Sequence, residues 1–135
     1  MLTLDVLIPA RDEAASLPLV LTDLPREGAG WWVRRVIVVD NGSRDRTAAV
    51  ARGLGAEVVR EPVAGYGRAC LAGLAHVRAS MPDVVVFLDG DHSDDPADLP
   101  ALLVPLVAGE AEMDEIVGIL GDVLAEAQRR LRSTS

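Results

Sequence analysis

The chain has 135 residues, 50% of them hydrophobic and only 3% aromatic, and its formal net charge is −8. This length predicts one domain, and the shortage of aromatic residues leaves Val, Leu, Ile and Ala to form a core typical of a parallel sheet covered by helices. The chain contains no lysine, which excludes P-loop phosphate binding and Schiff-base chemistry.

The first part of the chain predicts a strand and a helix. Residues 2–9 (LTLDVLIP) form an apolar run that predicts a strand. Asp12 and Glu13 are expected to open a helix that continues to about residue 24, because acidic residues in a first turn complement the helix dipole. Residues 26–32 (REGAGWW) are expected to form a loop that packs on a helix.

A second strand and helix follow. Residues 33–40 contain the continuous run VIVV and predict a buried strand. Ser43 is expected to be the N-cap of a helix that runs to about residue 54, and Gly55 is expected to end it. Residues 57–60 then predict a short third strand.

The remaining elements repeat this pattern. Residues 65–67 (GYG) predict a flexible loop that leads into a helix at 68–79. Residues 83–88 predict a fourth strand. Asp95 and Pro96 predict an N-cap followed by proline at the first helical position, so another helix is expected there.

The alternation of strands and helices predicts an α/β fold with a doubly wound, mainly parallel sheet of the Rossmann-like kind. Ligands bind such sheets beyond the carboxyl ends of the strands. Three turns rich in polar groups fall at predicted strand ends, namely Pro9–Arg11, Asp40–Ser43 and Asp89–Asp91. The fold should therefore bring them together.

Negative charge is concentrated near the last of these turns. Residues 79–128 contain twelve Asp or Glu and no Arg or Lys. Such a segment suits a divalent cation and argues against nucleic acid, which needs a basic surface. Asp89 and Asp91 follow a buried strand and are the candidate ligands of Mg²⁺ or Mn²⁺. The alternative, a solvated acidic loop, stays open for the acids that follow them.

Three other residues have both a functional and a structural interpretation. Asp40 can accept the N–H of a nucleobase, or it can cap its own turn. Glu13 can face the same pocket, or it can complement the helix dipole. Arg68, near a helix start, can hold a diphosphate or lie in solvent.

Four blocks of the sequence carry a resemblance to a known family, and they are VLIPARDEAASL, VIVVDNGSRDRTAAVA, GYGRACLAGLA and VVVFLDGDHSDDP. In this order and spacing they resemble the nucleotide-binding half of the family 2 glycosyltransferases, which have the GT-A fold. The resemblance is nearest to the branch that transfers sugars to dolichyl or polyprenyl phosphate. It covers residues 2–109, and we expect residues 1–109 to form the nucleotide-sugar-binding domain.

The resemblance implies roles for matching residues. Asp40 would read the base, and Asp89 and Asp91 would be the DxD pair that holds the metal against the diphosphate. Arg11 stands where the branch often has Tyr or Phe, and Gly90 where it often has Ala. The full set implied or suggested for binding the nucleotide sugar is Pro9, Ala10, Arg11, Glu13, Asp40, Arg68, Asp89 and Gly90.

Relatives continue into an acceptor-binding half that supplies the catalytic base, whereas residues 110–135 of this chain have helical spacing of apolar residues. We expect one amphipathic helix there in place of the acceptor half. Its apolar face must be buried on the sheet or against a second copy, so a homodimer is expected. No catalytic base is identified from the sequence.

The resemblance implies a glycosyltransferase that binds a UDP- or GDP-linked sugar through Mg²⁺ or Mn²⁺. The branch implies polyprenyl phosphate, at a membrane surface, as the acceptor. The alternative function is a truncated, non-catalytic nucleotide-binding or assembly module, and the missing acceptor half favours it for this chain alone. A phospho-acceptor receiver domain ordinarily needs a lysine beside its aspartates and is therefore disfavoured.

The sequence also bears on location. A single cysteine, Cys70, excludes an intrachain disulfide and fits a reducing compartment. The first residues carry no basic segment, and Asp5 interrupts their apolar run, so no signal peptide is expected. We expect a cytoplasmic protein, with peripheral attachment to the inner membrane face if the acceptor is a lipid.

Overall fold

The computed structural model of this chain describes residues 1–93, 95–101 and 103. Five strands form one sheet, and they are β1 (Leu2–Ala10), β2 (Glu27–Gly28), β3 (Trp31–Asp40), β4 (Glu57–Arg60) and β5 (Val84–Phe87). The helices are α1 (Leu17–Asp23), α2 (Thr47–Gly53), α3 (Tyr66–Val77) and the 3₁₀ turn η1 (Pro96–Asp98).

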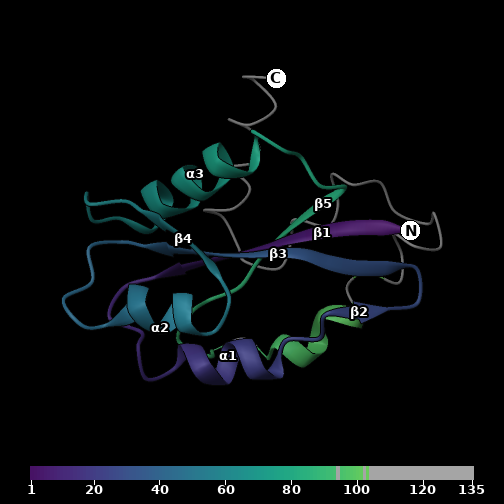
Figure 1. The fold of residues 1–135 in the computed structure, drawn as a ribbon, viewed down its shortest axis with the longest axis horizontal. Helices are drawn as coiled ribbons and strands as arrows, with labels where there is room; N and C mark the ends of the chain where they lie inside the picture. Colours follow the sequence, from purple (N-terminus) through teal and green to yellow (C-terminus); the bar gives the residue numbers. More distant parts are fainter. Residues whose placement is uncertain (94, 102, 104–135) are drawn as a thin grey trace.

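Four of the strands are parallel and lie in the order β4, β3, β1, β5. The short strand β2 pairs antiparallel with the beginning of β3. From β1 the chain moves outward to β3 and β4 and then returns to β5 on the other side of β1 (Figure 1). The order therefore reverses between β1 and β5, which is where doubly wound sheets bind their ligands.

Helices cover both faces of the sheet, so the structure has three layers (Figure 1). Alternate residues of β1 face opposite sides: Val6 and Ile8 lie in the core with α1 and α2, whereas Leu7 packs with α3. The helix α3 approaches closely at Gly73, where an added Cβ would lie 2.9 Å from Leu7 Cδ2. The predicted α/β fold with a mainly parallel sheet is confirmed.

The first helix begins later than predicted. It starts at Leu17, and Asp12 and Glu13 belong to the loop before it. Asp12 has a φ of 54°, which is incompatible with a right-handed helix. The backbone N–H groups of Asp12 and Glu13 bond instead to the hydroxyls of Ser43 and Thr47, at 3.0 and 2.9 Å. A contact distant in sequence thus overrides the local helix signal.

The predicted N-cap of the second helix is also wrong. Arg46 occupies that position and makes no side-chain capping bond. The Ser43 hydroxyl accepts the N–H of Asp12 instead. At the end of this helix the prediction is confirmed, because α2 ends at Gly53 and Gly55 takes a φ of 89°.

Residues 26–32 are not a simple loop. Glu27 and Gly28 form β2, and β3 begins at Trp31, which is 3% exposed.

The predicted third strand at 57–60 and the Asp95 N-cap are both observed, with Asp95 Oδ1 accepting the N–H of Ala97 at 3.0 Å. The predicted helix at 110–135 and its boundary lie outside the described residues. Within the described part, no helix is both long and apolar enough to cross a membrane.

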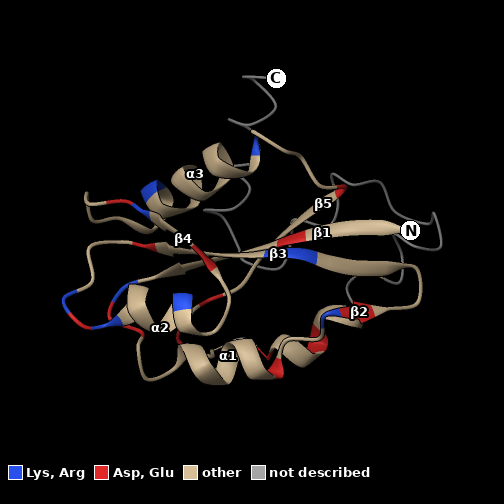
Figure 2. Cartoon of the chain, in the orientation of Figure 1, with Lys and Arg blue, Asp and Glu red and all other residues tan. Residues whose placement is uncertain are grey.

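A buried ion pair ties the centre of the sheet. Asp5 on β1 is fully buried, and its carboxylate lies 2.9 Å from Arg34 Nη2 and 2.5 Å from Arg35 Nη2 on β3. The acidic segment of β1 and the basic segment of β3 lie side by side in Figure 2. Burial opposes ionisation, but the hydrogen bonds and charges of the two guanidinium groups outweigh it and lower the pKa of Asp5.

Candidate functional site

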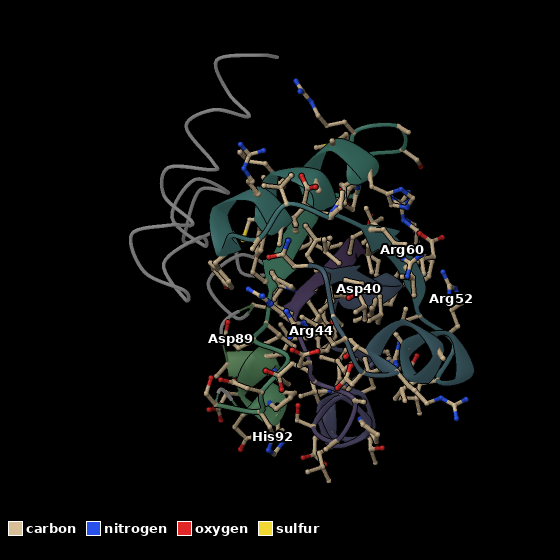
Figure 3. All side chains as sticks on the ribbon, turned by 90° about the vertical axis from the view of Figure 1, so that its left-hand side faces the viewer. Asp40, Arg44, Arg52, Arg60, Asp89 and His92 are labelled. Carbon is tan, nitrogen blue, oxygen red and sulfur yellow. The ribbon has the colours of Figure 1, made fainter. Side chains whose placement is uncertain are left out.

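A pocket of about 360 Å³ opens at the carboxyl ends of β1 and β5. Figure 3 faces this edge of the sheet, with Asp40, Arg44 and Asp89 lying across it. The residues that line the pocket are Pro9, Ala10, Arg11, Glu13, Asn41, Gly65, Tyr66, Ala69, Asp89, Gly90 and Asp91. It therefore lies where the strand order reverses, as expected for a ligand site on this fold.

The structure brings most of the predicted site residues together. The predicted residues that line the pocket are Pro9, Ala10, Arg11, Glu13, Asp89, Gly90 and Asp91. Asp40 and Arg68 do not line it. The three turns at strand ends, separate in sequence, are thus neighbours in space.

Asp40 points into its own turn. It ends β3, is 4% exposed, and its Oδ1 accepts the N–H of Ser43 at 3.1 Å. Its other oxygen, Oδ2, lies 3.9 Å from Arg60 Nε. This arrangement matches the structural interpretation of Asp40, in which the carboxylate caps the turn. The next residue, Asn41, is the one that reaches the pocket wall.

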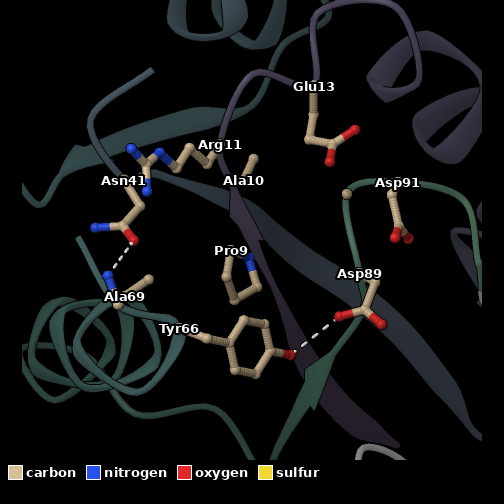
Figure 4. Close-up of a pocket in the computed structure, with 11 residues that line it drawn as sticks. Pro9, Ala10, Arg11, Glu13, Asn41, Tyr66, Ala69, Asp89 and Asp91 are labelled. Carbon is tan, nitrogen blue, oxygen red and sulfur yellow. Dashed lines mark hydrogen bonds between the residues drawn. The ribbon is translucent and has the colours of Figure 1, made fainter. Parts of the chain in front are cut away.

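Charge is divided across the pocket. In Figure 4 the carboxylates of Glu13, Asp89 and Asp91 gather on one side, and the Arg11 guanidinium lies beside Asn41 on the other. The Ser16 hydroxyl lies 2.5 Å from both Glu13 Oε2 and the Gly90 carbonyl oxygen, so it links α1 to the turn after β5. One side of the pocket is therefore suited to a cation.

Ser93 connects the two aspartates of that side. Its hydroxyl donates to Asp89 Oδ2 at 3.1 Å, and its backbone N–H donates to Asp91 Oδ1 at 2.9 Å. Hydrogen bonding from Ser93 lowers the pKa of Asp91. The carboxylate is thus anionic at neutral pH, which is the form that binds a metal.

The donor set fits Mg²⁺ or Mn²⁺. Among the residues described, no group of three or more His, Cys, Asp or Glu side chains is arranged to hold a metal by itself. Two carboxylates with open space beside them are instead what Mg²⁺ uses when phosphate oxygens and water complete its shell. Asp89 and Asp91 are the residues that would hold such an ion.

Four lining residues were not among the predicted site residues. They are Asn41, Gly65, Tyr66 and Ala69. Tyr66 begins α3, is 38% exposed, and donates its hydroxyl to Asp89 Oδ1 at 3.1 Å (Figure 4). Burial, with the nearby Cys70 and Asp89, raises the pKa of Tyr66, so the phenol keeps its proton. The sequence predicted a loop at 65–67 before a helix at 68, and that position was the available signal; α3 begins instead at Tyr66.

Asn41 fixes the loop between β4 and α3. Its Nδ2 donates to the carbonyl oxygens of Glu61 and Val63 at 2.9 and 2.8 Å, and its Oδ1 accepts the N–H of Gly65 at 3.0 Å. These partners use both amide donors and one acceptor site. The side chain therefore holds the loop that carries Tyr66 against the pocket.

Asp12 fixes the loop between β1 and α1. Its Oδ1 accepts the N–H of Arg44 at 2.7 Å, while its own N–H donates to Ser43 Oγ at 3.0 Å. The residues on either side of it, Arg11 and Glu13, both line the pocket. The pairing of Asp12 with the turn after β3 thus sets the path of two lining residues.

The two histidines lie away from the pocket wall. His92, next to Asp91 in sequence, takes a φ of 63° and places Nε2 2.9 Å from Asp23 Oδ2. This contact ties the turn after β5 to the end of α1. His76 lies on the surface of α3, with Nε2 2.9 Å from Glu57 Oε2. Neither histidine lines the pocket.

Comparison with protein families and curated proteins gives consistent matches. The family model described as glycosyl transferase family 2 matches residues 5–132. An uncharacterised glycosyltransferase of Mycobacterium tuberculosis is 45% identical over 104 residues, which are 77% of this chain and 44% of the relative. Glucosyl-3-phosphoglycerate synthase of the same species is 35% identical over 117 residues, 80% of this chain and 35% of that protein. The chain thus spans less than half the length of these relatives.

Solved structures agree with the fold. The crystal structure of M. tuberculosis glucosyl-3-phosphoglycerate synthase with UDP has a TM-score of 0.66 at 33% identity, over 81% of this chain and 41% of that one. A second structure of that enzyme, with Mn²⁺, UDP and glucosyl-3-phosphoglycerate, has a TM-score of 0.65 at 32% identity, over 81% and 41% of the two chains. The described sheet is therefore that of a GT-A glycosyltransferase.

Proposed function

The chain belongs to glycosyl transferase family 2, and we propose that its pocket binds the nucleoside diphosphate of a sugar nucleotide together with Mg²⁺ or Mn²⁺. One observation carries the proposal: Asp89 and Asp91 lie with Glu13 on one side of the pocket, at the reversal of strand order. The similar M. tuberculosis synthase has been crystallised with UDP and Mn²⁺, which supports this choice of ligands.

The lining residues have different roles in binding. Asp89 and Asp91 hold the cation against the diphosphate, and Pro9 and Ala10 lie along the nucleoside. Gly90 packs closely on the end of β1, since an added Cβ would lie 3.2 Å from Ala10 Cβ and 3.3 Å from the Pro9 carbonyl oxygen. Its lack of a side chain also leaves room for the phosphates. A bound Mg²⁺ or Mn²⁺ supplies neutralisation of the charge that develops on the departing diphosphate.

The role of Asp40 in recognising the base remains a prediction. The position fits the family pattern, but the side chain caps its turn through Ser43. A nucleobase in the pocket meets Asn41 and Arg11 first, since both line it. Arg68, on the first turn of α3, likewise remains a prediction as a contact of the diphosphate, because it lies outside the pocket lining.

We infer the reaction by analogy with the family. An acceptor oxygen forms a bond to the anomeric carbon as the bond from that carbon to the diphosphate oxygen breaks, with inversion. A hydroxyl acceptor must also give its proton to a base, whereas a phosphate acceptor is already anionic at neutral pH. We assign no base among the described residues.

For the acceptor, we propose the polyprenyl phosphate that the sequence resemblance implies, at the inner face of a membrane. The M. tuberculosis synthase, by its name, makes a glucosylated phosphoglycerate, so a small phosphorylated acceptor is the competitor. The two acceptors share a phosphate and differ in their apolar part. Transfer of labelled sugar into an organic phase supports the lipid, and transfer that stays in water with 3-phosphoglycerate contradicts it.

Nucleotide binding is tested by calorimetric titration with UDP, GDP and their sugar conjugates, once with Mn²⁺ and once with EDTA. We expect one nucleotide to bind at least ten times more tightly with Mn²⁺. Binding without transfer to either acceptor would indicate the alternative function, a non-catalytic nucleotide-binding module. No binding of any nucleotide would overturn the proposal.

The metal ligands are tested by Asp91→Ala. We expect this variant to lose metal-dependent nucleotide binding and to keep its circular dichroism spectrum, because Asp91 is exposed. Asp98→Ala is the matched control, since Asp98 is an exposed aspartate outside the pocket lining. Unchanged Mn²⁺-dependent affinity in Asp91→Ala would refute the assignment.

The predicted homodimer is tested separately, by sedimentation velocity at micromolar concentration. The residues expected to form its interface, 110–135, lie outside those described, so the prediction rests on their sequence pattern. A dimer that dissociates when Leu120 and Leu124 are replaced by Glu would support it. A monomeric wild-type chain would contradict it.

A further inference from the structure

We propose that Tyr66 is a positioning residue, whose hydroxyl holds Asp89 in the orientation that binds the cation. The inference rests on the nucleotide-binding function proposed above and assigns to it a residue on a different element. The hydroxyl of Tyr66 donates to Asp89 Oδ1 at 3.1 Å, and Figure 4 shows it reaching the carboxylate across the pocket. Neither the sequence pattern nor the resemblance pointed to this contact.

The backbone of Tyr66 is itself fixed. Gly65 takes a φ of 144°, which favours glycine, and its N–H donates to Asn41 Oδ1 at 3.0 Å. Further along α3, Gly73 packs closely against Leu7 of β1. The helix is therefore held at its start and along its length, and the phenol extends from a rigid support toward Asp89.

Asp89 is held from both sides. Tyr66 donates to Oδ1, and the Ser93 hydroxyl donates to Oδ2, each at 3.1 Å. An ionised carboxylate has about four lone-pair sites, so two donors leave room for a cation. Both donors are neutral, so they orient the carboxylate without cancelling its charge.

Hydrogen bonds of this kind tune metal sites. Ligating carboxylates are themselves held by outer partners, whose loss typically weakens metal affinity by about 10- to 100-fold. Ser93 reaches Asp89 from the same turn that carries Asp91, whereas Tyr66 reaches it from α3. Tyr66 therefore fixes the position of Asp89 relative to the rest of the pocket wall.

Tyr66→Phe isolates the hydroxyl, because the ring and its place in the pocket wall are kept. The quantity to measure is the ratio of the UDP dissociation constants in EDTA and in Mn²⁺. We expect this ratio to fall about tenfold. Ser93→Ala, which removes the other donor to Asp89, should lower the same ratio. Trp32→Phe is the control, since Trp32 is an exposed aromatic residue at the opposite end of β3.

A second readout does not depend on a binding constant. Tyr66 is the only tyrosine of the chain, so labelling tyrosine Cζ with ¹³C gives one resonance. With UDP present to complete the ion's shell, we expect this resonance to move when Mg²⁺ is added to the wild type, and to stay in place in Asp89→Asn. A wild-type resonance that stays in place when Mg²⁺ is added to the UDP complex would contradict the coupling between Tyr66 and the cation site.

The outcomes separate this inference from the function on which it rests. If Tyr66→Phe weakens UDP binding equally in EDTA and Mn²⁺, Tyr66 only shapes the pocket wall, and the inference is wrong. If it weakens neither, the hydroxyl has no role, and the inference is again wrong. In both cases nucleotide binding by the wild type stands. If the wild type shows no metal-dependent binding, the proposed function fails as well.

Discussion

The side-chain oxygen of Asn41 accepts the backbone N–H of Gly65 at 3.0 Å, and this bond ties the end of β3 to the residue before α3. The same amide donates to two carbonyl oxygens of the intervening loop. One side chain thus sets the position of an entire pocket wall. The pocket depends on residues that support its walls as much as on those that face a ligand.

The first prediction tests this support with Asn41→Asp. The new carboxylate would face the carbonyl oxygens of Glu61 and Val63, which would lose their donor. We expect the free energy of unfolding to fall by about 2–3 kcal/mol, as measured by urea denaturation. Ala49→Glu adds the same charge on the exposed surface of α2 and should change stability by less than about 0.5 kcal/mol. Equal losses of stability in Asn41→Asp and Ala49→Glu would refute the role of the Asn41 amide in holding the loop.

The second prediction concerns the loop between β1 and α1. Asp12 has a φ of 54° and accepts the N–H of Arg44. Asn tolerates this backbone conformation and keeps the accepting oxygen, so Asp12→Asn should retain nucleotide affinity within about threefold. Asp12→Ala loses the acceptor and strains the backbone, and we expect it to cost about 1–2 kcal/mol of stability.

Because Asp12 lies between Arg11 and Glu13, Asp12→Ala should also weaken UDP binding about tenfold. That change corresponds to a loss of about 1.4 kcal/mol of binding free energy. Calorimetry of the three proteins below their unfolding temperatures checks this. Equal affinity of the Ala and Asn variants would show that the loop holds its path without Asp12.

The third prediction is a dependence on pH that arises from Asp5. Its folded-state pKa is lowered below the ordinary value of 3.8, so its contribution to stability is full above about pH 4 and is lost as the pH falls through the folded-state pKa. Asp5→Asn should remove the part of the acid-induced loss of stability that comes from protonation of Asp5. It should also cost about 3 kcal/mol at neutral pH, because two partly buried guanidinium groups lose their partner.

The free energy of unfolding at several values between pH 7 and pH 3 gives both quantities. Glu27→Gln is the control, because Glu27 is an exposed carboxylate on β2. It should leave the curve close to that of the wild type. If Asp5→Asn followed the wild-type curve at a constant offset down to pH 3, the lowered pKa of Asp5 would be refuted.

Much of the fold could be predicted because its signals are local. Runs such as Val36–Val39 identify buried strands, and the alternation with helices leaves few topologies. The errors fell where distant contacts decide the structure. Asp12 looks like the start of a helix until Ser43 takes its N–H. Trp31 looks like part of a loop until its pairing with β1 places it in a strand.

The site was predictable where residues follow strand ends. Pro9, Ala10 and Asp89 lie there, and all three line the pocket. Tyr66 was missed because its importance comes from the packing of α3, which brings it to Asp89 from 23 residues away. Asp40 and Asn41 are neighbours in sequence, and only their side-chain partners show which of them reaches the pocket.

The last prediction separates two glycines on helices. An added Cβ at Gly73 of α3 would lie 2.9 Å from Leu7 Cδ2 and 3.0 Å from Val39 Cγ2, whereas at Gly53 of α2 it would meet nothing within 4 Å. Ala is favoured over Gly in a helix by about 1 kcal/mol, so Gly53→Ala should stabilise the protein by up to that amount. At Gly73 the same gain is outweighed by overpacking of about 1–3 kcal/mol.

Gly73→Ala should therefore lower the midpoint of urea unfolding while Gly53→Ala raises it. Because α3 carries Tyr66, a displaced helix should also reduce the Mn²⁺-dependent part of UDP binding in Gly73→Ala and leave it intact in Gly53→Ala. Opposite shifts in stability with equal UDP affinities would mean that α3 can move without disturbing Asp89. Equal shifts in stability would mean that α3 is not held against the sheet at Gly73.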